Sequence, residues 1–273
     1  MFEMFSYPFM VRAIIVGLLV SLSASLLGVS LVLRRYSMIG DGLSHVGFGA
    51  LSVATVLGIS PLGFTIPVVV IAAILLLSLS EKKGAIASDS MIALIASASL
   101  SVGIMAISFV KGTNTDINNF LFGSLLAVGK SDAVFSIILS TIVLVCYIVL
   151  YPRLFAVTFD PVFARSSGLN VKGYTMLLAI LAALTITLGM RMLGSLLISA
   201  LIIFPALSSM RLFRRYKSVT ISSAIISIVA FMVGITLSYS YGTPVGASIV
   251  LVNLAVFIIF SIVGFVVRRT RKE

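Results

Sequence analysis

The feature that most constrains this chain is a succession of long apolar runs that extends over almost its whole length. Runs of about 18–22 residues recur, and about 20 helical residues cross the roughly 30 Å hydrocarbon core of a bilayer. The runs are continuous rather than alternating with period two, which argues against a membrane β-barrel. Hydrophobic residues make up 60% of the 273 residues and charged residues 10%, against about 45–50% and about 25% in soluble domains. The chain is therefore predicted to be an all-α, polytopic membrane helix bundle.

We expect about eight to nine transmembrane helices in a single membrane domain that covers residues 1–273. The first run has no basic n-region and no A-x-A cleavage site, so it is predicted to be a retained helix rather than a signal peptide. Two places leave the helix count open between eight and ten. LFGSLLAVGK (121–130) would need shelter inside the protein if it is re-entrant, and residues 190–192 would form a very tight hairpin. The predicted spans are 11–33, 38–57, 64–80, 90–110, 133–151, 173–190, 192–210, 218–238 and 246–267.

Basic residues gather on one side of these spans. Placing the C-terminal RRTRKE in the cytoplasm puts 15 of the 19 Lys and Arg residues on that side, as the positive-inside rule requires. Membrane orientation thus explains the net charge of +11 without a nucleic-acid partner. We expect a multi-pass protein of a bacterial-type plasma membrane with a cytoplasmic C-terminus. The four basic residues on the other side are Arg12, Lys111, Lys130 and Arg191.

The longest polar segment on the cytoplasmic side, residues 151–170, contains a predicted short helix. Asp160 followed by Pro161 is typical of an N-cap with proline at the first helical position. Phe163 and Ala164 are predicted to form its apolar side, and Gly168 is placed to end it. Such a helix either lies at the membrane interface or docks a soluble partner. The spacing alone favours neither interpretation.

The stretch GDGLSHVGFG (40–49) contains the only histidine of the chain, His45, four residues after Asp41. Residues four apart share one helix face, with Cβ atoms about 5–6 Å apart. A carboxylate and an imidazole suit Zn²⁺, Mn²⁺ or Fe²⁺. Two ligands are too few for a closed site, so a two-fold dimer would supply the others, or Asp89 would contribute. This pattern indicates a metal contact inside the membrane.

A structural interpretation of the same residues remains open. Arg34 and Arg35 lie just upstream, so one of them would pair with Asp41 near the membrane interface, and His45 would be a hydrogen-bonded packing residue. Ionisable residues in membrane helices are functional candidates by default, but the spacing does not exclude this alternative. Two roles likewise stay open for Arg191: its side chain either snorkels to the interface or guards a pore.

Signatures of nucleotide binding and of catalysis are missing from the sequence. GSLLAVGKS (123–131) has five residues between its glycines, whereas a phosphate-binding loop has four. A single histidine excludes the H-E-x-x-H motif, and no G-x-S-x-G motif is present. The single cysteine, Cys146, excludes a disulfide framework within the chain. The chain is not expected to bind ATP or to be an enzyme.

Five stretches carry recognisable motifs: LLGVSLVLRRYSMIGDGLSHVGFG (26–49), LFGSLLAVGKSD (121–132), FDPVFARSSGL (159–169), GMRMLGSLLISALIIFPALSS (189–209) and TPVGASIVL (243–251). The first resembles a signature in which a helix ends in paired arginines and is followed by G-D-x-L-S-H. The second and third resemble L-F-G-S-x-L and F-D-x-x-F-A-R-x-x-G-L. In this order the motifs resemble those of one family, the integral-membrane permeases of binding-protein-dependent ABC transporters for zinc, manganese or iron.

The resemblance implies an importer-type fold similar to that of cobalamin and siderophore permeases. It implies a homodimer that works with cytoplasmic ATP-binding subunits and an extracellular metal-binding protein, and no permanently bound cofactor, because Zn²⁺, Mn²⁺ or Fe²⁺ is the substrate. Asp41 and His45 match the pathway residues of the family. Asp89 follows a serine where family members often have an acidic pair, so its part in the pathway stays open. The residues that match the ATPase coupling helix are Phe159, Asp160, Pro161, Phe163, Ala164, Arg165, Gly168 and Leu169.

Two other functions remain as alternatives. The same architecture would suit a metal chelate such as a siderophore, although the scarcity of polar groups argues against it. A stand-alone secondary metal transporter would need no ATPase. The carried metal also stays open, because carboxylate and imidazole ligands accept all three ions, and selectivity is expected to reside in the extracellular partner.

Overall fold

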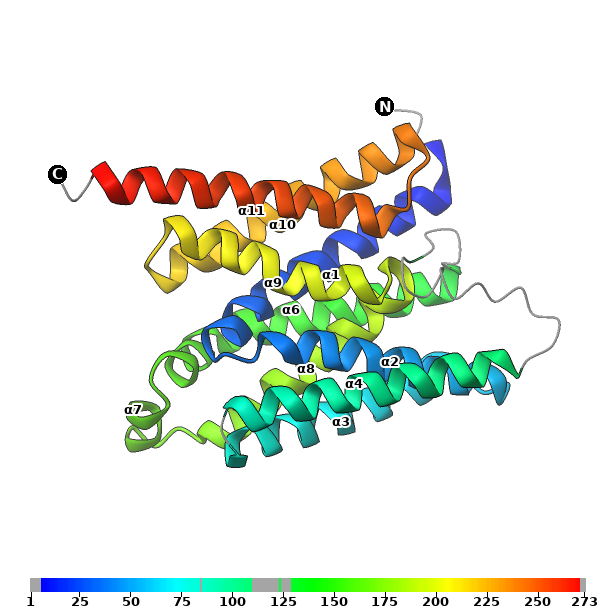
Figure 1. Cartoon of the computed structure of the whole chain (residues 1–273), viewed down its shortest axis with the longest axis horizontal. Coiled ribbons are helices and arrows are strands. Elements are labelled where there is room, and N and C mark those ends of the chain that lie inside the picture. The colour runs from blue at the N-terminus through cyan, green and yellow to red at the C-terminus, as the bar shows by residue number, and fades with distance from the viewer. Residues whose placement is uncertain (1–5, 84, 110–122, 124–128, 271–273) are drawn as a thin grey trace.

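The computed structural model describes residues 6–83, 85–109, 123 and 129–270. These residues form helices and no strands, and the long helices run side by side along one direction (Figure 1). The helices are α1 (Pro8–Leu33), α2 (Ser37–Val56), α3 (Pro61–Lys83), α4 (Ala85–Ser108), α6 (Lys130–Phe159), α7 (Pro161–Ser166), α8 (Val171–Leu193), α9 (Ser195–Leu212), α10 (Tyr216–Tyr241) and α11 (Val245–Thr270).

All the helices in the described part of the chain except α7 coincide with predicted spans, which confirms the all-α bundle. Seven of them are long and apolar enough to cross a membrane. The exceptions are α2, which is diluted by glycines, serines, Asp41 and His45, and α9, whose apolar part covers only Leu197–Leu212. The predicted bounds were too narrow for α6, which has 30 residues. The helix begins earlier, at the polar residues Lys130–Asp132, and it continues through Pro152 and Arg153, which interrupt the apolar run.

The helices differ in how much of their surface the bundle covers. About 72% of the apolar window of α1 is buried and 67% of that of α8, against 17% for α4 and for α11. Figure 1 shows α11 along one edge and α3 and α4 along the other. Serines link the buried helix α1 to α10, because Ser227 Oγ on α10 donates a hydrogen bond to the carbonyl oxygen of Ser21 on α1 at 2.9 Å. The most exposed helices therefore form the two edges of the bundle.

Glycines let α2 and α1 approach their neighbours at backbone distance. A Cβ added to Gly49 on α2 would lie 2.6 Å from the carbonyl oxygen of Ser99 on α4. A Cβ on Gly28 of α1 would overlap the carbonyl group of Ile202 on α9. Small residues permit such contact between membrane helices, where tails provide no hydrophobic drive. As a result α2 packs closely among α3, α4, α8 and α9.

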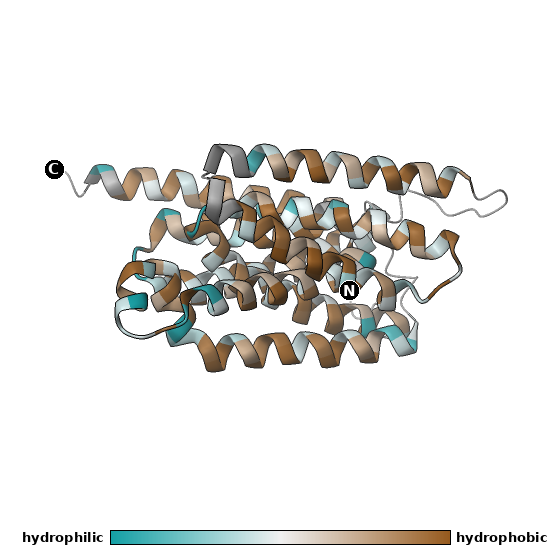
Figure 2. Cartoon of the chain, turned by 90° about the horizontal axis from the view of Figure 1, so that it is seen from below, coloured by the Kyte–Doolittle hydropathy of each residue, from teal (hydrophilic) through white to brown (hydrophobic). Residues whose placement is uncertain are grey.

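The two ends of the bundle differ in charge. The α7 helix, the α9–α10 turn and the C-terminal end of α11 lie at one end, the α7 end, and the N-terminus lies at the other (Figure 1). Apolar residues dominate the helices, while hydrophilic positions gather near their ends (Figure 2). The helix bounds place the following predicted cytoplasmic basic residues at the α7 end: Arg34, Arg35, Lys82, Lys83, Arg153, Arg165, Lys172, Arg211, Arg214, Arg215, Lys217, Arg268 and Arg269.

The predicted re-entrant segment LFGSLLAVGK lies outside the described residues except for Gly123, Gly129 and Lys130. Gly123 has a φ of +78° and packs against the junction of α8 and α9, where a Cβ would lie 2.7 Å from the backbone nitrogen of Gly194. Gly194 itself has a φ of +92°. The tight hairpin expected at residues 190–192 is thus a turn at Gly194, which lies between α8 and α9.

Candidate metal-ion site

Asp41 and His45 lie one helical turn apart on α2, as their spacing predicts. Asp41 is near the start of this helix and therefore nearer the α7 end of the bundle. Its side chain is 44% exposed and that of His45 is 18% exposed. The three residues between them are buried. In this turn of α2 the acid and the imidazole are thus the side chains that reach open space.

The two side chains approach each other to 3.7 Å, measured from His45 Nε2 to Asp41 Oδ2. This distance is too long for a hydrogen bond. It is close to the separation of two ligands on one metal ion, because ligand atoms about 2.0–2.2 Å from a tetrahedral zinc lie about 3.4 Å apart. The carboxylate oxygen and the imidazole nitrogen can therefore bind the same divalent cation after a small adjustment.

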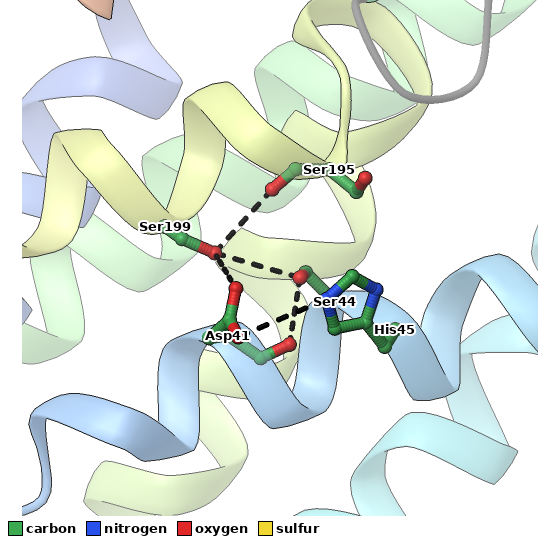
Figure 3. A network of polar contacts seen from close by, with 5 residues as sticks. All are labelled: Asp41, Ser44, His45, Ser195 and Ser199. Atoms are coloured by element: carbon green, nitrogen blue, oxygen red, sulfur yellow. Dashed lines mark hydrogen bonds and ion pairs between the residues drawn. The ribbon is translucent and has the colours of Figure 1, made fainter. Parts of the chain in front are cut away.

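The neighbouring helix α9 contributes the hydroxyl group of Ser199 to this site (Figure 3). Ser199 Oγ lies 3.4 Å from Asp41 Oδ1, 3.4 Å from Ser44 Oγ and 3.3 Å from the carbonyl oxygen of Ser195. Ser44 Oγ donates to the carbonyl oxygen of Asp41 at 2.7 Å. These serines were not predicted from the sequence. A signal was present, since Ser195 and Ser199 repeat the four-residue spacing of Asp41 and His45 on another predicted span.

Asp89, the third predicted pathway residue, lies near the start of α4 with an exposed side chain. Within the described ranges, no three side chains of His, Cys, Asp or Glu are grouped so that they could hold a metal ion. Asp41 and His45 of one copy are therefore too few ligands to form a closed metal site. A role of Asp89 stays a prediction.

The structure gives less support to the alternative in which Asp41 pairs with an arginine and His45 is a packing residue. Arg34 Nη1 donates to Thr175 Oγ1 on α8, and the guanidinium carbon lies 5.4 Å from the centre of the Tyr36 ring. His45 Nδ1 is buried and has no hydrogen-bond partner among the described residues. A buried polar atom without a partner costs about 1–3 kcal/mol. The histidine is therefore poorly explained as a hydrogen-bonded packing residue.

A second candidate site is the short helix α7, whose predicted start and end are confirmed. Asp160 Oδ1 accepts from the backbone N–H groups of Val162 at 3.1 Å and Phe163 at 2.9 Å, with Pro161 at the first helical position. Gly168 has a φ of +82°, a conformation that favours glycine. Local sequence thus determines both ends of this helix.

The apolar residues of α7 face in two directions, so the predicted single apolar side was wrong. Ala164 is fully buried against Val157 and Val171, because α7 packs back on α6 and α8. Phe163 is 65% exposed. Exposed apolar side chains at this end of the bundle include Phe159, Val162 and Phe163. The helix is thus fastened to the bundle by one face and presents apolar groups on another.

Arg191 forms an ion pair with Asp132, and its two predicted roles, snorkelling to the interface and guarding a pore, stay predictions. Arg191 Nη1 and Nη2 each lie 3.0 Å from one oxygen of the carboxylate, and the side chains are 29% and 31% exposed. Asp132 is in the first turn of α6 and Arg191 in the last turn of α8, so each charge is at the helix end whose dipole favours it. The pair borders a cavity of about 490 Å³ that also contacts the start of α3.

We expect Arg191→Ala to lower the thermal stability of the chain more than Lys130→Ala. The first change removes the bidentate partner of a partly buried carboxylate, and hydrogen bonds to charged groups contribute about 1.5–3 kcal/mol. Lys130 is exposed in the same turn of α6 as Asp132, so its replacement is the control. The fraction of monodisperse protein that remains after heating in detergent measures the difference. Equal losses would mean that the pair does not anchor α8 to α6.

These features define a class of protein: a polytopic membrane bundle with a carboxylate–imidazole pair among apolar helices and a short helix with exposed apolar side chains at one end. The profile of the ABC 3 transport family matches residues 6–264. The chain belongs to the ABC 3 transport family.

Known proteins of similar sequence match nearly the whole chain. The high-affinity zinc uptake system membrane protein ZnuB of Haemophilus influenzae is 32% identical over 247 residues, which cover 90% of this chain and 94% of ZnuB. The manganese transport system membrane protein MntC of Listeria monocytogenes is 31% identical over 255 residues, which cover 93% of this chain and 90% of MntC.

A solved structure of PsaBC from Streptococcus pneumoniae in complex with Fab shares the fold. One of its chains superposes with a TM-score of 0.82 at 28% identity, and the match covers 93% of this chain and 91% of that chain. The predicted importer-type permease fold is therefore confirmed, as is the resemblance inferred from the motifs.

Proposed function

We propose that this chain is the membrane permease of an ABC importer that moves a divalent transition-metal ion, Zn²⁺, Mn²⁺ or Fe²⁺, across the plasma membrane. The observation that carries the proposal is the 3.7 Å approach of Asp41 Oδ2 and His45 Nε2 in a bundle of the ABC 3 transport family. Relatives named for zinc uptake and manganese transport support a metal ion as substrate. ATP hydrolysis takes place in separate cytoplasmic subunits.

Two copies of the chain complete the ion pathway in this proposal. One copy offers two ligand side chains, whereas Zn²⁺ usually has about four ligands and Mn²⁺ about six. A two-fold dimer would bring a second pair of Asp41 and His45 to the same route. The 44% exposure of the Asp41 side chain in a single copy supports a route that is open on this side. Asp89 remains a further candidate ligand.

The proposed site binds its ion weakly, because a conducting site must also release the ion. Each copy contributes a single carboxylate, and its close neighbours Ser44 and Ser199 are neutral hydroxyls. Such a site has little power to select manganese, since the affinity order at a shared site favours zinc. We therefore assign selectivity to the extracellular metal-binding protein that delivers the ion.

In the same proposal, residues Phe159–Leu169 form the coupling helix and its flanks. The exposed apolar side chains Phe159, Val162 and Phe163 would bind the ATPase subunit. The buried Ala164 joins α7 to α6 and α8, so that a movement of α7 passes into the bundle. The basic residues at the α7 end support a cytoplasmic position for this helix and for the C-terminus.

Reconstituted uptake tests this function. The chain is co-purified with its ATPase subunit, inserted into liposomes that enclose ATP, and supplied on the outside with the extracellular binding protein. We expect accumulation of radioactive zinc, manganese or iron that requires both ATP and the binding protein. Metal movement down its gradient without ATP would support a stand-alone transporter instead. Uptake of a metal chelate but not of the free ion would support a siderophore permease.

A further inference from the structure

We propose that Ser199 on α9 is a positioning residue for the ion site: its hydroxyl holds one carboxylate oxygen of Asp41 and thereby directs the other toward His45. This inference rests on the proposed function, in which Asp41 and His45 contact the transported ion. Ser199 lies on a different helix, 158 positions after Asp41 in the sequence. The motif that contains Asp41 and His45 includes only residues of α2.

The two oxygens of Asp41 have different neighbours. Oδ1 lies 3.4 Å from Ser199 Oγ, and Oδ2 lies 3.7 Å from His45 Nε2. A carboxylate that is free to rotate about its Cβ–Cγ bond would also adopt orientations in which neither oxygen faces the imidazole. A hydrogen bond to Oδ1 opposes that rotation. Ser199 is thus placed to present Oδ2 to a cation bound at Nε2.

Ser199 is better suited to this role than the serine on α2. Ser44 Oγ already donates its single proton to the carbonyl oxygen of Asp41 at 2.7 Å. It can therefore accept a hydrogen bond from Ser199 but cannot also donate one to the carboxylate. The hydroxyl of Ser199 has three acceptors within 3.3–3.4 Å. The carboxylate is the charged one, and hydrogen bonds to ionised acceptors are about twice as strong as neutral ones.

The long distances around Ser199 indicate that its proton is not committed to one acceptor. Hydroxyl hydrogen bonds are usually about 2.7–2.8 Å long, and all three contacts of Ser199 exceed this value. When a cation binds Oδ2, it fixes the carboxylate, and Ser199 can shorten its contact with Oδ1. Metal-binding carboxylates generally have such a partner, and its loss typically costs about 10–100-fold in affinity or activity.

The chain provides a matched control in Ser195, one turn away on the same helix. Ser195 is 1% exposed, compared with 8% for Ser199. Its hydroxyl has no hydrogen-bond partner among the described residues, and only its backbone carbonyl joins the network. Ser195→Ala therefore removes a buried hydroxyl from α9 without removing a contact to Asp41. Ser199→Thr keeps the hydroxyl at position 199 and serves as the conservative variant.

The experiment compares manganese and zinc uptake by the reconstituted transporter carrying Ser199→Ala, Ser199→Thr, Ser195→Ala or Asp41→Ala. We expect Ser199→Ala to raise the KM for the metal by about tenfold while the maximal rate and the thermal stability change little, because ion capture is weakened and the bundle is intact. Ser199→Thr should restore the KM to within about twofold of the unmodified protein, since a hydroxyl that can contact Asp41 Oδ1 is retained. Ser195→Ala should leave the KM unchanged.

Two results would overturn the inference while the proposed function survives. One is an unchanged KM in Ser199→Ala together with loss of uptake in Asp41→Ala. The other is an equal rise of KM in Ser199→Ala and Ser195→Ala, which would indicate general damage to the packing of α9. Unchanged uptake in Asp41→Ala would instead refute the proposed ion site itself, and the role of Ser199 with it.

Discussion

Asp41→Ala and His45→Ala are each expected to reduce ATP-driven metal uptake by more than about 100-fold, since even loss of a residue that only supports a metal ligand costs about 10–100-fold. Each change removes one of the two proposed ligand atoms, which lie 3.7 Å apart. The remaining side chain would then face the ion alone within its copy. Uptake of radioactive metal into liposomes at saturating binding protein measures the effect.

Assembly and ATP hydrolysis are the controls for these two variants. Asp41 and His45 lie on α2, whereas the proposed ATPase contact is on α7. Copurification of the ATPase subunit and its ATP hydrolysis should therefore remain close to those of the unmodified protein. Normal uptake in both variants would show that the ion takes another route. Asp89→Ala, measured alongside, decides whether the third predicted acid belongs to that route.

Features that depend on local sequence could be predicted well. The predicted spans located every long helix of the described residues, and seven of these helices are apolar runs long enough to cross a membrane. Asp160 and Gly168 were correctly interpreted as the start and stop of α7, since a cap and a positive-φ glycine act on their own turn. The shared face of Asp41 and His45 also followed directly from helix periodicity.

Features that depend on how the helices pack could not be predicted. Ser199 reaches Asp41 because α9 lies beside α2 in one register, and Arg191 reaches Asp132 across 59 positions of sequence. Hydropathy has no information on such pairings, because it describes each helix alone. Ala164 was assigned to the wrong face for the same reason. Its burial depends on Val157 and Val171, which belong to the ends of the two flanking helices.

The second large effect is expected at α7, where Phe163→Ala should weaken binding of the ATPase subunit by about 30-fold. Truncation of an aromatic anchor at the centre of an interface typically costs at least about 2 kcal/mol, which corresponds to this factor. Phe163 is 65% exposed in the free chain, so the partner can cover it without rearranging the bundle. The affinity of the two purified subunits in detergent measures the change, and uptake should fall with it.

Phe109→Ala is the matched control for Phe163→Ala. Phe109 is 74% exposed just after α4, at the end of the bundle opposite α7, so its loss should not affect ATPase binding.

Asp160→Ala distinguishes the contact made by Phe163 from the stability of helix α7. It removes the cap of α7 at a cost of about 0.5–2 kcal/mol and leaves Phe163 in place. We expect it to weaken binding less than Phe163→Ala, since the buried Ala164 still fastens the helix. Equal affinities of the unmodified chain and Phe163→Ala would place the ATPase contact elsewhere and make α7 a helix of the membrane interface.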